Sequence, residues 1–124
     1  MKLAWHFKSG LSIASQIVDK LRRDILSGAY ETGAPFPTVR QLAEEASVNP
    51  NTMQRALTEL ENEGLILSLG TVGRIVTTDG EVLKKAKEEE LSVFIDGVIK
   101  STKAMNIEKD TFLELVKKGW DNNG

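Results

Sequence analysis

Amide side chains, hydroxyls and one arginine gather in a short run near the middle of the chain, which reads Asn49-Pro50-Asn51-Thr52-Met53-Gln54-Arg55. Asn and Gln can pair through two hydrogen bonds with the N6 and N7 edge of adenine, and Arg can do the same with the O6 and N7 edge of guanine. Each such pair discriminates between bases by about 1–3 kcal/mol. The run therefore has the chemistry of a surface that reads base edges in the DNA major groove.

Two helices joined by a tight turn are predicted to position these side chains. Thr38 begins the first of them, and Gln41 lies three residues on, as in a capping box. Asn49 caps the second helix, and Pro50 occupies its first position, where a missing N–H costs nothing. Only three or four residues separate the two helices, which is the spacing of a helix-turn-helix.

Apolar residues at helical spacing indicate which face of each helix is buried. The predicted core positions are Val39, Leu42, Ala43 and Ala46 in the first helix and Met53, Ala56, Leu57 and Leu60 in the second. This leaves an outward face of Asn51, Thr52, Gln54, Arg55 and Thr58. A solvated polar face is the simpler alternative, but such a face usually carries Glu and Lys, as residues 84–90 do. The second helix of the pair is therefore predicted to enter the major groove, with Arg40 beside it on a phosphate or a base.

Further elements are predicted on both sides of this pair. An apolar stripe at Ala14, Ile17, Val18, Leu21 and Ile25 predicts a helix over residues 12–27. Residues 30–37 are rich in helix breakers and form a loop. Gly64 ends the second helix of the pair. Residues 66–69 and 74–77 form a hairpin around a four-residue turn.

The last third of the chain predicts two helices. Thr78 and Glu81 form a second capping box at the start of a long helix, whose second half carries apolar residues up to Met105. The chain breaks at residues 106–108, a short helix follows, Trp120 lies just past it, and residues 121–124 fray. The predicted fold is mainly α with a small β-hairpin: a winged helix-turn-helix DNA-binding domain at 1–78 and a two-helix dimerisation tail at 79–124.

Composition fits a small folded protein. The chain has 124 residues, 40% of them hydrophobic and 27% charged, and no Cys, which excludes disulfides and thiolate metal sites. No apolar run is long enough to span a membrane, and Met1 to His6 lack the apolar core of a signal peptide. A cytoplasmic protein is expected. The net charge of −2 argues weakly against a nucleic-acid partner, although net charge does not report where charges point.

No residues are spaced for catalysis, so the chain is not expected to be an enzyme. His6 is the only histidine, and one histidine without Cys makes no transition-metal site. Glu88, Glu89 and Glu90 point in different directions on a helix and indicate a solvated face. No metal and no cofactor are expected.

Three segments resemble the winged-helix domain of GntR-family transcription regulators, in order and in spacing: residues 36–43, 48–57 and 60–66. The resemblance runs from about Ile13 to Val76, and the short tail resembles the YtrA-like branch, whose members dimerise through it. It implies repression, or occasionally activation, through a palindromic operator, often of a transporter operon. It also implies DNA contacts at Arg40, Asn49, Asn51, Thr52, Gln54, Arg55 and the wing around Gly73.

The wing departs from the family pattern. Relatives commonly place an arginine there, whereas this chain reads Gly70-Thr71-Val72-Gly73-Arg74-Ile75. Two interpretations stay open: Arg74 takes the place of the usual arginine, or the wing touches only the DNA backbone.

The tail carries more apolar surface than two isolated helices can bury: Leu91, Phe94, Ile95, Val98, Phe112, Leu115 and Val116. This apolar surface could pack in a groove of the same chain. We expect it instead to pack against the tail of a second copy. A two-fold dimer places two recognition helices about 34 Å apart on an inverted repeat of double-stranded DNA. The alternative is a protein-interaction module that acts through this tail. A tail of two helices is not expected to form a pocket large enough for a small-molecule effector. A site for such an effector would then lie at the dimer interface.

Overall fold

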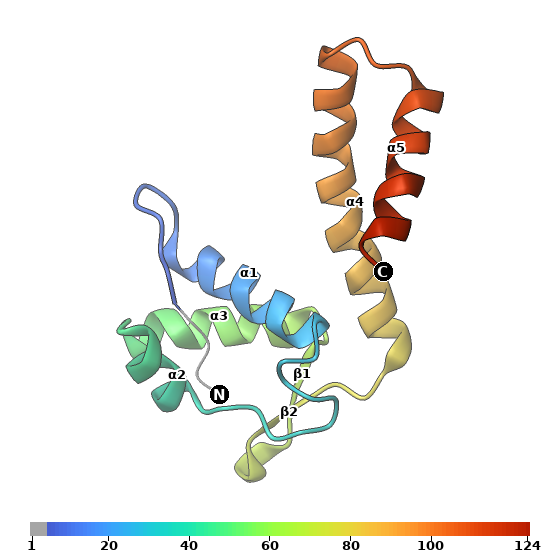
Figure 1. Cartoon of the computed structure of the whole chain (residues 1–124). Coiled ribbons are helices and arrows are strands. Elements are labelled where there is room, and N and C mark those ends of the chain that lie inside the picture. The colour runs from blue at the N-terminus through green and yellow to red at the C-terminus, as the bar shows by residue number, and fades with distance from the viewer. Residues whose placement is uncertain (1–4) are drawn as a thin grey trace. The chain divides into compact units, whose positions relative to one another are not determined.

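The computed structural model describes residues 5–124 (Figure 1). Met1 to Ala4, which belong to the segment that lacks the apolar core of a signal peptide, lie outside the described residues. The elements follow in the order α1 (Ile13–Leu26), α2 (Val39–Ala46), α3 (Pro50–Asn62), β1 (Ile66–Ser68), a 3₁₀ turn (Gly70–Val72), β2 (Arg74–Val76), α4 (Gly80–Ala104) and α5 (Lys109–Asn122). The predicted fold class, mainly helical with a small antiparallel hairpin, is confirmed.

The chain forms two compact units, Met1–Ala86 and Lys87–Gly124. The start of α4 belongs to the first unit, where Val82, Leu83 and Ala86 pack on the core. In the second unit, α4 and α5 lie side by side and run in opposite directions (Figure 1). The functional division into residues 1–78 and 79–124 stays a prediction.

The core of the first unit lies where the predicted apolar stripes meet. α1 and α2 both pack against α3, and the buried set is Ile17, Val18, Leu21, Ile25, Phe36, Leu42, Ala43, Ala46, Met53, Ala56, Leu57, Leu60, Leu65, Ile66 and Val76. Ala14 and Val39, also predicted in the stripes, are half-buried. Complete burial of one Leu or Met contributes about 1.5–3 kcal/mol, so these contacts fix how each helix is rotated about its axis.

The predicted helix ends around the turn are confirmed. The Thr38 hydroxyl accepts the Gln41 N–H at 3.1 Å while the Gln41 side chain accepts the Thr38 N–H at 2.9 Å. Asn49 Oδ1 accepts the Asn51 N–H at 2.7 Å, directly before Pro50. Ser47 takes the left-handed conformation (φ 55°), which closes the turn between α2 and α3.

Three details of the C-terminal third were predicted wrongly. The expected Thr78–Glu81 capping box is absent, because the Asp79 carboxylate accepts the N–H groups of Glu81 (3.0 Å) and Val82 (3.4 Å) and α4 begins at Gly80. Met105 lies just beyond the end of α4 at Ala104, so this helix ends earlier than predicted. α5 extends to Asn122, so Trp120 lies within it, and of the four residues expected to fray only Asn123 and Gly124 lie beyond the helix.

The hairpin is held by a segment that the sequence indicated only as a loop. β1 and β2 pair with Ile66 opposite Val76 and Ser68 opposite Arg74. On the other edge of β2, Val76 accepts the Gly33 N–H at 2.9 Å, and the Phe36 N–H donates to the Arg74 carbonyl at 2.8 Å. Residues 33–36 thus run along β2 as an irregular third strand. The loop before α2 therefore anchors the wing to the helices.

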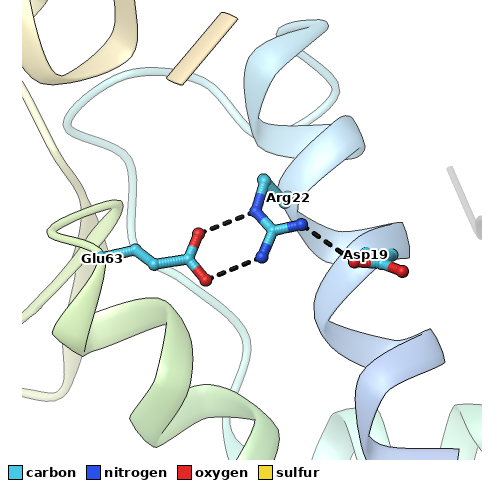
Figure 2. A network of polar contacts seen from close by, with 3 residues as sticks. All are labelled: Asp19, Arg22 and Glu63. Carbon is cyan, nitrogen blue, oxygen red and sulfur yellow. Dashed lines mark hydrogen bonds and ion pairs between the residues drawn. The ribbon is translucent and has the colours of Figure 1, made fainter. Parts of the chain in front are cut away.

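An ion network joins α1 to the end of α3. Figure 2 shows the Arg22 guanidinium donating from Nε and Nη2 to the two carboxylate oxygens of Glu63, both at 2.7 Å, and from Nη1 to Asp19 at 2.9 Å. The hydrogen bonds to Glu63 raise the pKa of Arg22 above its usual value. The paired geometry ties α1 to the residue that ends α3.

We expect Glu63→Gln to lower the free energy of unfolding by about 1–2 kcal/mol, because it removes the charge from a partly buried, two-bond pair. Thermal unfolding followed by circular dichroism measures the loss. Asp19→Asn is the matched control, since it removes the same charge from the same arginine at a site that is 55% exposed. A loss as large for Asp19→Asn as for Glu63→Gln would contradict the role given to the Glu63 pair.

Tyr30 gives a second test of the packing around the loop. Its ring lies 4.9 Å from that of Phe36, and burial, together with the charges of Asp24 and Glu45, raises its pKa to about 12. The folded state therefore keeps the phenol protonated where the unfolded chain, with a pKa of about 10, has lost the proton.

This stabilisation is complete below about pH 10 and lost as the pH rises through about 12. We expect wild type to lose more stability over that window than Tyr30→Phe, which keeps the ring and removes the titrating group. Chemical unfolding of both proteins at several pH values measures the difference. Parallel curves for the two proteins would contradict the pKa shift.

Candidate nucleic-acid interface

The rotation of α3 decides which side chains face outward. Met53 and Leu57 are completely buried on one side of the helix. On the opposite side Asn51, Gln54 and Arg55 are exposed, and Thr52 is half-buried. The outward face therefore carries amides, a hydroxyl and a guanidinium at the N-terminal end of the helix, as a helix needs if it is to contact base edges.

Weak local hydrogen bonds hold these side chains in place. The Gln54 side chain donates to the Thr58 hydroxyl at 3.2 Å, and Arg55 donates to the Thr52 hydroxyl at 3.5 Å. Asn49 uses its side-chain oxygen to cap the helix, which leaves its NH₂ group as the donor toward a partner. Exposed bonds of this length are readily exchanged for bonds to bases or phosphates, so the face is ordered without being blocked.

Arg40 stands near the start of α2, with its side chain 89% exposed. Its described partner is Glu44, one turn later, at 3.6 Å. An exposed ion pair of this kind contributes little, about 0–1 kcal/mol, and does not compete with a DNA phosphate. The exposed guanidinium of Arg40 thus stays available for the predicted contact to a phosphate or a base.

Acidic side chains lie close to the arginine of α3. Arg55 lines a hollow between α1 and α3 together with Glu59, Asp19 and Arg22. The guanidinium of Arg55 therefore lies in mixed-charge surroundings, in keeping with the net charge of −2 of the whole chain.

The wing carries the two remaining predicted DNA contacts. Gly73 lies at φ 105°, in a region that favours glycine, and closes the turn through a 2.7 Å bond from the Leu69 N–H to its carbonyl. Arg74 points away from the turn: its Nε bonds to the carboxylate of Glu61 on α3, and its side chain is only 21% exposed. No local pattern in the sequence indicates this pair, because thirteen residues and a change of element separate its members.

The second unit presents the apolar residues that were predicted to dimerise. Phe94, Leu115 and Leu91 are 69%, 57% and 56% exposed, and Ile95 and Val116 are also exposed. Val98 and Phe112 are half-buried. The two helices of this unit thus leave most of these side chains uncovered.

Within residues 5–124 no three His, Cys, Asp or Glu side chains are grouped to hold a metal ion. None of the helices described there is both long enough and apolar enough to cross a membrane.

Comparison with known proteins supports the interpretation of the helix-turn-helix. Residues 13–76 match the family model described as bacterial regulatory proteins, gntR family. The HTH-type transcriptional regulator YhcF of Bacillus subtilis is 28% identical over 111 residues, which are 90% of this chain and 92% of YhcF. The HTH-type transcriptional repressor YtrA of the same organism is 34% identical over 74 residues, 60% of this chain and 57% of YtrA.

A solved structure extends the likeness to the whole chain. A GntR family transcriptional regulator from Listeria monocytogenes superposes with a TM-score of 0.82 at 30% identity, over 90% of this chain and 98% of that one. The relatives are regulators rather than enzymes. The chain belongs to the GntR family of bacterial DNA-binding transcriptional regulators, with a YtrA-type repressor among its relatives.

Proposed function

We propose that this protein is a homodimeric repressor that binds a palindromic operator through α3. The observation that carries the proposal is the uncovered polar face at the start of α3, held outward by the burial of Met53 and Leu57. A relative of this chain is a named repressor, which supports repression as the outcome of binding. The resemblance to the YtrA-like branch extends the proposal to the operator of a transporter operon.

Each predicted contact has a role in this proposal. Asn51, Gln54 and Arg55 read base edges in the major groove, because they are exposed at the end of α3 that enters first. Arg40, Asn49 and Thr52 bind phosphates, together with the free N–H groups at the starts of α2 and α3. Gly73 and the wing lie against the neighbouring stretch of backbone. A protein with this role works in the cytoplasm, where the bacterial chromosome lies.

The dimer rests on the apolar face of the second unit. An exposed face that includes Phe94 and Leu115 is large for a solvated helix pair and is typical of a surface that binds another protein. Two copies of the same tail can pair about a two-fold axis, so that each apolar face covers the other. Such a dimer presents two α3 helices to two half-sites about 34 Å apart.

We expect Arg55→Ala and Arg40→Ala each to weaken binding to the operator by about 5- to 150-fold, because each removes a charged contact worth about 1–3 kcal/mol. Arg55→Ala also relaxes the preference for one base, whereas Arg40→Ala weakens all sequences equally. Selection of bound sequences from random duplexes identifies the operator, and fluorescence anisotropy measures the affinities.

Arg23→Ala is the matched control, since it removes another exposed arginine, which lies on α1 at a hollow lined by residues of the N-terminal segment. Its affinity should stay within about twofold of wild type. If Arg40→Ala and Arg55→Ala bind duplex DNA as wild type does, while binding of a protein partner fails, the interaction-module alternative replaces the regulator.

We expect Phe94→Asp to weaken the dimer on the order of 100-fold, because a charge enters an apolar interface at a cost of several kcal/mol. Sedimentation at several concentrations measures the dissociation constant. Val93→Asp is the control: Val93 is 73% exposed, close to the 69% of Phe94, but helix geometry turns it toward the other side of α4. A dimer that survives Phe94→Asp, or that Val93→Asp disrupts equally, would exclude this interface.

A further inference from the structure

We infer that Glu61 determines how the wing meets DNA: it holds Arg74 against α3, so the wing approaches the duplex without a positive charge. The inference rests on the proposed function and adds to it a residue outside the α3 face that positions the charge of the wing. It also decides between the two interpretations of the wing that the sequence left open, in favour of a wing that touches the backbone without an ion pair.

The first observation is the position of the arginine. Arg74 is the only charged residue between Leu65 and Thr78, so it is the whole charge of the hairpin. It begins β2 opposite Ser68, and its carbonyl accepts the Phe36 N–H at 2.8 Å. The backbone on which the side chain stands is therefore fixed on both edges of the strand.

The second observation is the partner of that side chain. The Nε of Arg74 bonds to Oε1 of Glu61, with side chains only 21% and 29% exposed. Partial burial weakens screening by water and salt, so this pair is held more firmly than the exposed pair of Arg40 with Glu44. A guanidinium that already has a carboxylate partner releases few counterions from DNA and adds little to the salt dependence of binding.

The third observation is what remains at the tip of the wing. Val72 is 83% exposed, and Leu69 is 46% exposed beside it. The 3₁₀ turn at Gly70–Val72 thus presents a neutral surface with one apolar side chain at its end. Such a surface contacts sugars and groove walls by shape, and these contacts do not depend on salt.

The experiment compares salt dependence in four single variants of the full-length chain. Affinity for one operator duplex is measured by fluorescence anisotropy in about 50 to 200 mM potassium chloride, and the slope of log affinity against log salt is taken for each protein. Each new phosphate contact steepens the slope by about 0.9 per protomer. Circular dichroism establishes that every variant is folded.

Arg74→Gln should leave the slope unchanged, because the arginine does not touch DNA. Glu61→Gln should steepen it by up to about one contact per protomer, because Arg74 is released. Val72→Arg should also steepen it by about 0.9, because it places an unpaired cation at the tip of a wing that lies beside the duplex. Glu31→Gln, which removes an exposed carboxylate from the loop before α2, is the control and should change the slope less than Glu61→Gln.

Three results would overturn the inference alone while wild type still binds the operator. They are a shallower slope for Arg74→Gln, an unchanged slope for Val72→Arg, and an equal effect of Glu31→Gln and Glu61→Gln. Wild-type protein that is folded and ignores every duplex would instead overturn the proposed function, and this inference with it.

Discussion

The burial of one side of α3 is the constraint on which the rest of the molecule depends. Met53, Leu57 and Leu60 are completely buried against α1 and α2, and this leaves no freedom for the helix to rotate. A turn of about 100°, one residue step, would expose part of this stripe and bury Gln54 or Arg55 without partners. The same contacts that stabilise the first unit therefore also aim the polar residues outward.

Charge is distributed so that few cations remain unpaired near this face. Arg22 is bonded to Glu63 and Asp19, and Arg74 is bonded to Glu61, so two of the arginines close to α3 serve its attachment. Arg40 and Arg55 stand exposed on the outer side. A small regulator with a net charge of −2 can approach DNA in this way, because position rather than total charge decides the local potential.

The local signals in the sequence predicted the helix-turn-helix well, and the long-range contacts escaped them. Thr38 with Gln41, and Asn49 with Pro50, act within a few residues, so their patterns were sufficient to locate both helix starts. The start of α4 was misjudged because Thr78 and Asp79 are both good caps, and only the surrounding structure chooses Asp79. The Arg74–Glu61 pair and the strand at 33–36 join distant parts of the chain. Periodic patterns in a single sequence indicate local elements and do not indicate such contacts. The outward residues of α3 followed directly from its apolar stripe, and their roles on DNA stay predictions.

The irregular strand at 33–36 has a consequence for how copies of the chain meet. With β2 flanked on both sides, the outer edges of the described sheet are β1, which is three residues long, and the irregular segment 33–36, where Pro35 has no N–H to donate. Short edges of this kind are poor templates for sheet growth between molecules. Pairing of strands between molecules is thereby disfavoured. The chain can carry an apolar tail without also being prone to fibril-like aggregation through its sheet.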